Sequence, residues 1–302
     1  MKKFFIAIVA LAAAVACSND DIISIDRQAI GFGNPFVENS VRADYSDGQD
    51  LTAFTVYGTV TGNNNTVALF GGDGANVTGS VGAEEWNCAE TEYWVPGADY
   101  AFVAVVDATV ASQDANKMPL TLTTVADATS NLEDMLYAKA TVEDAAADED
   151  VVNFNFSHLL SKVHFTVTSN ATDGYRHTIT NITVANFESG TYTINGGTWS
   201  GTTAKDVAFA EIAQVTKATG AKSNADLLLV PNAATFNVTF TVDLYKGETK
   251  LGTETKTVAV DNDLVKGNSY NFTIECSVGN PIKFTVANDP TWPDTPTDVT
   301  VQ

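Results

Sequence analysis

Two residues near the N-terminus have the surroundings of sites for covalent modification. The first, Cys17, follows a basic start, an apolar run over residues 4–15 and the small residue Ala16. This is the layout of a secretory signal, and it is too short to span a membrane as a permanent helix. A cysteine at this place matches the motif of bacterial lipoprotein precursors, although Ala14 stands where leucine is most usual. We expect a signal peptide over residues 1–16 and a lipid such as palmitate on Cys17; an ordinary signal peptide is the alternative.

Arg42 is the second such residue. The chain has arginine only at positions 27, 42 and 176, and Arg42 lies in a polar stretch directly before Ala43. A lone arginine in such a stretch is a target for an Arg-specific protease. Upstream, Ile30 and Phe32 point to one face with a glycine on either side of Phe32, as in a short strand, and Phe36 follows. We predict that Ile30, Phe32 and Phe36 form a removable strand, which cleavage between Arg42 and Ala43 would separate from the rest.

No combination of residues indicates catalysis. The histidines are scattered, with His158 placed at a turn, His164 opposite an apolar face, and His177 alone. No GxSxG, HExxH or P-loop motif occurs. The acidic run over residues 143–150 favours a solvated linker over a cation site. The sequence therefore predicts a protein that is not an enzyme and that holds no metal or cofactor.

Charge and cysteine content exclude two further classes of protein. The 302 residues include 37 acidic and 16 basic side chains, which gives a formal net charge of -21. Such a chain repels phosphate backbones, so we exclude nucleic acid as a partner. Apart from Cys17, only Cys88 and Cys276 remain, which is too few for a disulfide framework. Cys276 alternates within a strand-like run and is expected to be a small core residue.

From residue 51 onward the hydrophobic pattern has a period of two and is broken by Gly, Asn, Asp and Thr clusters. Residues 236–244, for example, are apolar at every second position. No helical periodicity of useful length follows the signal. Many short alternating strands with polar turns predict an all-β fold of two tandem antiparallel β-sandwiches. With the boundary in the acidic linker, the N-terminal sandwich would span residues 43–150 and the C-terminal sandwich residues 151–281.

The C-terminal segment, residues 282–302, ends the chain with two strand-like pieces. Ile282, Phe284 and Val286 alternate in the first piece, and Val299 and Val301 alternate in the second. Three prolines between the two pieces keep the connection extended and outside any central ladder. One interpretation is a frayed end; the other is a donor strand for a different molecule. Burial of these five side chains would contribute roughly 8–15 kcal/mol gross, at about 1.5–3 kcal/mol each.

The order of these features resembles the fimbrillin family of type V pilus subunits. The matching stretches run from AIGFGNPFVENSVRA through FTVYGTV, EYWVPGADYAFVAV, DMLYAKATV and FSHLLSKVHFTV to LVKGNSYNFTIECS, and so cover nearly the whole chain. The resemblance implies two transthyretin-like β-sandwiches and export as an outer-membrane lipoprotein lipidated at Cys17. It also implies extracellular cleavage at Arg42-Ala43 by an Arg-specific protease, which removes the leader, residues 17–42. A C-terminal segment of another pilin subunit would then fill the vacated groove.

The resemblance implies a structural subunit of a cell-surface pilus that supports adhesion. The alternative is an anchored surface lipoprotein that binds glycan or host protein and never polymerises. A tip adhesin would be expected to lack a donor tail. The sequence does not distinguish a stalk subunit from an accessory one, and it does not identify a receptor.

Overall fold

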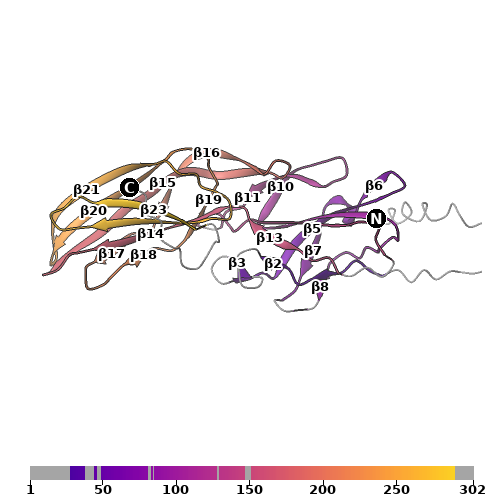
Figure 1. Ribbon diagram of the computed structural model, residues 1–302, viewed down its shortest axis with the longest axis horizontal. Coiled ribbons are helices and arrows are strands. Elements are labelled where there is room, and N and C mark those ends of the chain that lie inside the picture. The colour runs from indigo at the N-terminus through magenta and orange to yellow at the C-terminus, as the bar shows by residue number, and fades with distance from the viewer. Residues whose placement is uncertain are drawn as a thin grey trace, which may run out of the picture.

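The computed structural model describes residues 28–37, 44–45, 49–80, 83, 85–127, 129–146 and 151–289. They form two β-sandwiches placed end to end in an elongated molecule, with most strands running near the long axis (Figure 1). The predicted all-β class is confirmed. Within the described residues, the helical content amounts to a 3-10 turn at Phe70–Gly72, and no helix is long and apolar enough to cross a membrane.

The N-terminal sandwich is built on a nine-stranded sheet. In spatial order the strands of its main path are β1 (Phe32–Gly33), β8 (Glu85–Cys88), β7 (Ala75–Thr78), β5 (Ala53–Gly62), β9 (Asp99–Val106), β12 (Leu136–Val142), β13 (Asn155–His158) and β2 (Phe36–Val37). The ninth strand, β6 (Asn65–Ala68), pairs with β5. A separate small ribbon is formed by β3 (Asp44–Tyr45) and β4 (Gln49–Asp50). The first and last strands of the path, β1 and β2, belong to one short segment, so the sheet closes on itself.

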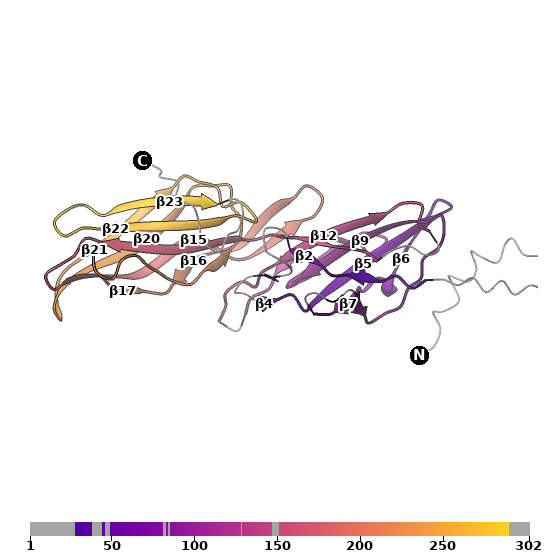
Figure 2. The ribbon, with the colours of Figure 1, turned by 60° about the horizontal axis from the view of Figure 1, so that its bottom comes forward.

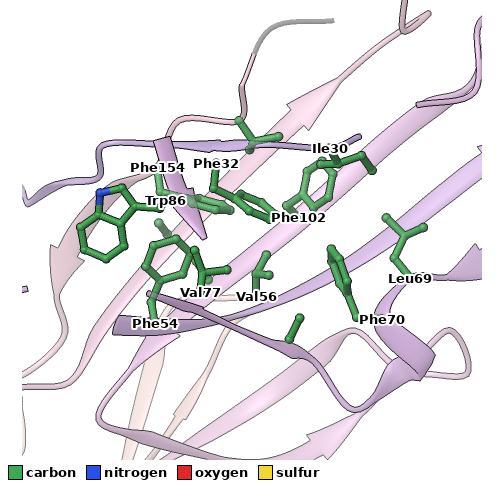
Figure 3. Close-up of a cluster of buried hydrophobic side chains, with 14 of the residues drawn as sticks. Ile30, Phe32, Phe54, Val56, Leu69, Phe70, Val77, Trp86, Phe102 and Phe154 are labelled. Carbon is green, nitrogen blue, oxygen red and sulfur yellow. The ribbon is translucent and has the colours of Figure 1, made fainter. Parts of the chain in front are cut away.

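Aromatic side chains fill the interior of this sandwich. Phe54 and Val56 on β5 and Phe102 on β9 face inward because strand residues alternate between the two faces, and each is at most 3% exposed. Phe54 stacks on Trp86 with ring centroids 5.6 Å apart. Figure 3 shows these rings gathered with Phe32 and Phe154.

Two sheets form the C-terminal sandwich. The seven-stranded sheet contains β10 (Ala108–Gln113), β11 (Pro119–Thr124), β15 (Tyr175–Thr193), β20 (Phe236–Lys246) and β21 (Thr249–Val260), with β16 (Thr198–Phe209) and β17 (Ile212–Val215) also paired to β15. The five-stranded sheet contains β18 (Lys222–Ser223), β14 (Ser161–Ser169), β22 (Ser269–Cys276) and β23 (Lys283–Asp289), with β19 (Leu227–Leu229) paired to β14. The pairing is mostly antiparallel, as predicted; β14 with β22 and β13 with β2 are parallel exceptions.

The two sandwiches are joined by strand pairing and by a shared apolar cluster. The β10–β11 hairpin comes from the N-terminal half of the sequence, yet β11 pairs with β15 of the C-terminal sheet. Beneath it, Val105, Leu122, Leu159 and Leu160 lie in one buried cluster with side chains from both halves. Both backbone hydrogen bonds and a buried apolar cluster therefore connect the two sandwiches.

The expected boundary at residues 150 and 151 is wrong by about ten residues. That boundary places Val152, Phe154 and Phe156 in the C-terminal sandwich, but they pack in the N-terminal aromatic core. Alternating residues identify a strand and its buried face, but they do not say which of two cores that face will enter. Apart from the β10–β11 hairpin, the strands of the C-terminal sandwich begin with β14 at Ser161 and extend through β23 to Asp289.

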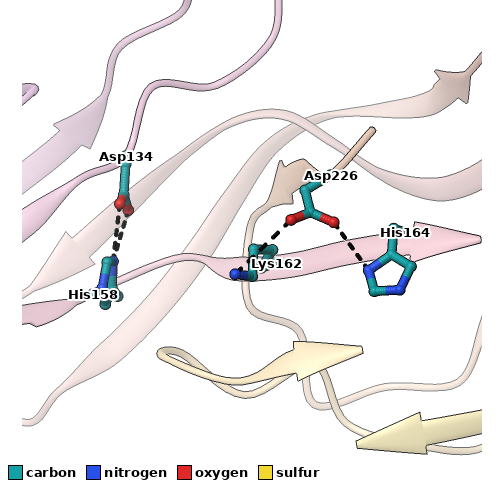
Figure 4. A network of polar contacts seen from close by, with 5 residues as sticks. All are labelled: Asp134, His158, Lys162, His164 and Asp226. Atoms are coloured by element: carbon teal, nitrogen blue, oxygen red, sulfur yellow. Dashed lines mark hydrogen bonds and ion pairs between the residues drawn. The ribbon is translucent and has the colours of Figure 1, made fainter. Parts of the chain in front are cut away.

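His158 is not at a turn. It ends β13 and is 3% exposed, with its Nδ1 atom 2.9 Å from an Asp134 carboxylate oxygen (Figure 4). Nearby on β14, Lys162 and His164 both approach Asp226, whose side chain is 39% exposed (Figure 4).

The buried Asp134–His158 pair is expected to stabilise the protein more than an exposed pair does. Because an unpaired polar group in the interior loses its hydration without compensation, Asp134→Ala should lower the free energy of unfolding by about 1–3 kcal/mol. Glu254→Ala is the control, since Glu254 pairs with Lys256 where both side chains are at least 40% exposed. It should change stability by less than about 1 kcal/mol. Urea denaturation followed by tryptophan fluorescence measures both; equal effects would contradict a structural role for the buried pair.

Candidate functional site

Residues 28–37 form a segment that is bonded to the sheet on both sides; we call it the closing segment. On one side Ile30 N–H donates to the Glu92 carbonyl at 2.8 Å, and Phe32 is paired with Trp86 of β8. On the other side Gly33 N–H donates to the Val152 carbonyl at 3.0 Å. The segment therefore lies between β8 and the strand that leads into β13.

The closing segment completes the ring of strands in the N-terminal sandwich. β2 at its C-terminal end continues the second pairing, parallel to β13, with Phe36 N–H donating to the Phe154 carbonyl at 2.9 Å. Without this segment, β8 and residues 151–156 would each present an unpaired edge. Such an edge readily accepts another strand.

The side chains of the closing segment are part of the aromatic core. Phe32 is fully buried and lies among four phenylalanine rings, with centroid separations of 5.9 Å to Phe154, 6.1 Å to Phe102 and 6.3 Å to both Phe54 and Phe70 (Figure 3).

Ile30 is 6% exposed and Val37 is fully buried. Burial of these two side chains and Phe32 contributes roughly 5–9 kcal/mol gross, at about 1.5–3 kcal/mol each. Their removal would open a groove with an apolar floor.

Phe36 lies in the closing segment but does not contribute to the core. Ile30 and Phe32 share one face, and that face is buried, whereas Phe36 is 48% exposed and Val37 takes the inward position. Residues 34 and 35 interrupt the strand between β1 and β2, and Pro35 has no N–H for a ladder. The alternation therefore resumes one residue out of phase.

Glycine at position 33 allows a close approach at the edge of the groove. A Cβ atom built there would lie 2.2 Å from Asn153 Oδ1 and 3.0 Å from Val151 Cγ2. The absence of a side chain at Gly33 therefore lets Val151 and Asn153 of the neighbouring strand pack directly against the backbone of the closing segment.

Other predicted residues at this end of the chain fall outside the described residues. Cys17, Arg42 and Ala43 are among them, and so is the leader before residue 28. The lipid on Cys17 and the cut after Arg42 stay predictions.

The predicted donor residues divide into two groups. Ile282, Phe284 and Val286 lie at or in β23, which pairs with β22 of the same chain over residues 283–289, at the edge of the sheet (Figure 2). Phe284 stacks on Phe240 at 5.8 Å, and Val286 is 7% exposed. Val299 and Val301 lie outside the described residues.

The described residues offer no metal-binding cluster. Within them, no group of three His, Cys, Asp or Glu side chains is placed to hold a metal ion. Cys88 and Cys276 are both free thiols, and burial raises the pKa of Cys276 to about 12, so its thiolate is not populated at neutral pH.

Sequence reasoning missed part of the groove. Trp86 and Phe154 would line it, and Val37 fills it from the closing segment, yet the sequence pattern indicates only Ile30, Phe32 and Phe36 here. The alternation of Val152, Phe154 and Phe156 is the available signal, but after the acidic linker it favours the start of the other sandwich.

Solved structures with this fold come from several Bacteroides species. A fimbrial protein from Bacteroides vulgatus superposes with a TM-score of 0.61 at 14% identity, over 89% of this chain and 100% of that one. A candidate cell adhesion protein from Bacteroides uniformis gives a TM-score of 0.57 at 20% identity, over 88% and 99% of the two chains. One from Bacteroides ovatus gives 0.54 at 16% identity, over 86% and 96%.

At these identities the likeness establishes the fold. Sequence comparison with curated proteins gave no match. The family model described as fimbrillin-like matches residues 42–288, which is most of the chain and begins at Arg42. The chain belongs to the fimbrillin-like family.

Proposed function

We propose that the protein is a structural subunit of a type V pilus that contributes to cell-surface adhesion. Its family membership and its fold, shared with a fimbrial protein and with candidate cell adhesion proteins, support this role. The observation that carries the proposal is the closing segment. It is hydrogen-bonded on both sides, it buries three apolar side chains, and it precedes the predicted cut at Arg42 in the sequence.

In the proposed sequence of events the subunit reaches the outer membrane as a lipoprotein held by Cys17. An Arg-specific protease then cuts between Arg42 and Ala43, and both the lipid and the closing segment leave with the cleaved leader. The groove between β8 and residues 151–156 becomes open, and a strand from another pilin subunit fills it by β-augmentation.

Cleavage acts as the switch because it changes the competition between two strands. Before the cut, the closing segment belongs to the same chain as its groove, so its effective concentration is about millimolar or higher and a free strand does not displace it. After the cut, the segment can dissociate and competes as a separate molecule. No nucleotide or other energy source is required, and the protein acts as a structural subunit without an enzymatic role.

We assign the donor to the segment that follows Asp289. β23 also belongs to the predicted donor range, residues 282–302, but it forms seven register pairs with β22 and contributes Val286 to the C-terminal core. Its transfer would first require these contacts to break. Val299 and Val301, two residues apart, can face one side of an added strand.

The double substitution Val299→Asp and Val301→Asp is expected to prevent polymerisation. Two carboxylates would have to enter an apolar groove, and burial of unpaired charge is strongly unfavourable. Thr300→Asp is the matched control because its side chain faces the opposite side of the same strand. Polymer length on denaturant-free gels measures the effect, with the double variant expected as monomer and the control as wild-type ladders. Polymers of normal length from the double variant would place the donor elsewhere, with β23 as the next candidate.

A further inference from the structure

Arg176 is the single arginine among the described residues, and it lines a cavity of about 470 Å³. The cavity lies at the end of the C-terminal sandwich away from the N-terminal sandwich. Its walls come from the connection between β14 and β15, from the chain after β17, and from the turn between β20 and β21 (Figure 1). This volume is within the range of about 300–1,000 Å³ typical of small-molecule sites.

The guanidinium of Arg176 is held in place by one aromatic ring and one exposed carboxylate. Its carbon lies 4.3 Å from the centroid of the Tyr245 ring, and Nη2 is 3.5 Å from a carboxylate oxygen of Glu248. The Glu248 side chain is 98% exposed, whereas that of Arg176 is only 20% exposed. In the described part of the chain, Nη1 is buried and has no hydrogen-bond partner.

These contacts favour a carboxylate ligand. Arginine binds carboxylates through two parallel N–H donors, and the geometry is strongest when the arginine is already fixed. An exposed ion pair contributes about 0–1 kcal/mol, so an incoming carboxylate can displace Glu248 at small cost.

The remaining walls favour a saccharide as the carrier of that carboxylate. Thr172 and Thr216 carry hydroxyl groups, Asp173 supplies acceptor oxygens, and Tyr175 supplies an aromatic ring. The cavity is formed by turns and strand ends, which do not provide the free strand edge to which an extended peptide would pair.

We propose that this cavity binds an acidic sugar through Arg176. The inference rests on the proposed adhesive function, for which it supplies a receptor class. The site is at the opposite end of the subunit from the groove, so binding and assembly use separate surfaces.

Binding of paired acidic and neutral sugars to the full chain tests the site. The probes are methyl glucuronide against methyl glucoside, and 3′-sialyllactose against lactose, titrated by NMR or calorimetry. We expect at least one acidic probe to bind, with its neutral counterpart at least tenfold weaker. Arg176→Gln should weaken binding at least tenfold. Lys256→Gln removes a positive charge outside the cavity and should leave binding unchanged.

A second variant keeps the test decisive if Arg176→Gln does not fold. Glu248→Ala removes the resident carboxylate and should strengthen binding of the acidic probe by about twofold to fivefold, which is the effect of losing a weak exposed pair. Neutral sugars that bind equally well would overturn the proposal. So would unchanged affinity in both cavity variants, or acetate binding as tightly as the acidic sugar.

Polymer assembly, measured on the same samples, separates this inference from the proposed function. Arg176→Gln should polymerise like the wild type, and its loss of sugar binding alone supports the inference. Because sugar binding is measured on the monomer, a wild-type chain that fails to polymerise would count against the pilus proposal and would leave the binding result valid. An Arg176→Gln chain that binds sugar normally and fails to polymerise would overturn the sugar site.

Discussion

Arg42→Ala is expected to yield a folded, lipidated monomer that forms no polymer. The reason is that the closing segment would stay covalently attached to the subunit and would continue to occupy the groove that a donor strand must enter. This is an all-or-none effect on assembly. The stability of the subunit should not fall, because the segment that buries Ile30, Phe32 and Val37 is retained.

Arg27→Ala is the matched control for this variant. Arg27 also lies in the leader, but it precedes the closing segment, so its loss should leave both cleavage at Arg42 and polymer length unchanged. N-terminal sequencing of material sheared from the cell surface measures the outcome. Ala43 is the expected first residue, whereas an acylated Cys17 on the surface would favour an anchored binding module. Normal polymers from Arg42→Ala cells would refute the proposed switch.

Phe32→Ala should cause the largest loss of stability of any side-chain truncation in the closing segment. Phe32 is fully buried among four aromatic rings, and truncation of a buried phenylalanine costs about 3–5 kcal/mol because a cavity remains. Phe36→Ala, on the same segment but 48% exposed, should change stability by no more than about 0.5 kcal/mol. Urea unfolding of the uncleaved chain measures both free energies.

The same pair of variants gives a second readout after cleavage. The closing segment is absent from the assembled subunit in our proposal, so neither substitution should alter the stability of finished polymers. Polymers weakened by Phe32→Ala would mean that the segment remains in the groove, and the exchange mechanism would then be wrong.

Much of the architecture could be predicted from the period-two pattern because it reports a local property. At Phe236, Val238 and Phe240 every second residue is buried, as expected for a strand with one face on a core. The pattern does not report which core a strand joins. Phe154 and Phe156 follow an acidic linker, a change of composition that predicts a domain boundary, although both rings return to the N-terminal core.

The candidate site was predictable only in part for the same reason. Ile30 and Phe32 could be assigned to a buried strand, but Pro35 changes the phase of the alternation, so that Val37 replaces Phe36 in the core. The other wall of the groove comes from residues about 120 positions later in the chain, a pairing that no local pattern encodes. The cavity at Arg176 depends on three separate connections and has no continuous motif.

Charge is distributed unevenly between the two sandwiches. Residues 43–158 contain 19 acidic and 2 basic side chains, whereas residues 159–289 contain 12 acidic and 10 basic ones. The N-terminal sandwiches of adjacent molecules therefore repel each other at low ionic strength, and salt reduces this repulsion.

The path of the chain through the joint also determines how the molecule carries tension. Residues 151–169 run without a helix or long loop from the wall of the groove, through β13 and the buried His158, into β14. In the proposed polymer, a pulling force on a strand seated in the groove would pass along this backbone into the eight-pair ladder between β14 and β22. Because these strands run near the long axis, the force acts in shear on many hydrogen bonds at once instead of breaking them one after another (Figure 1).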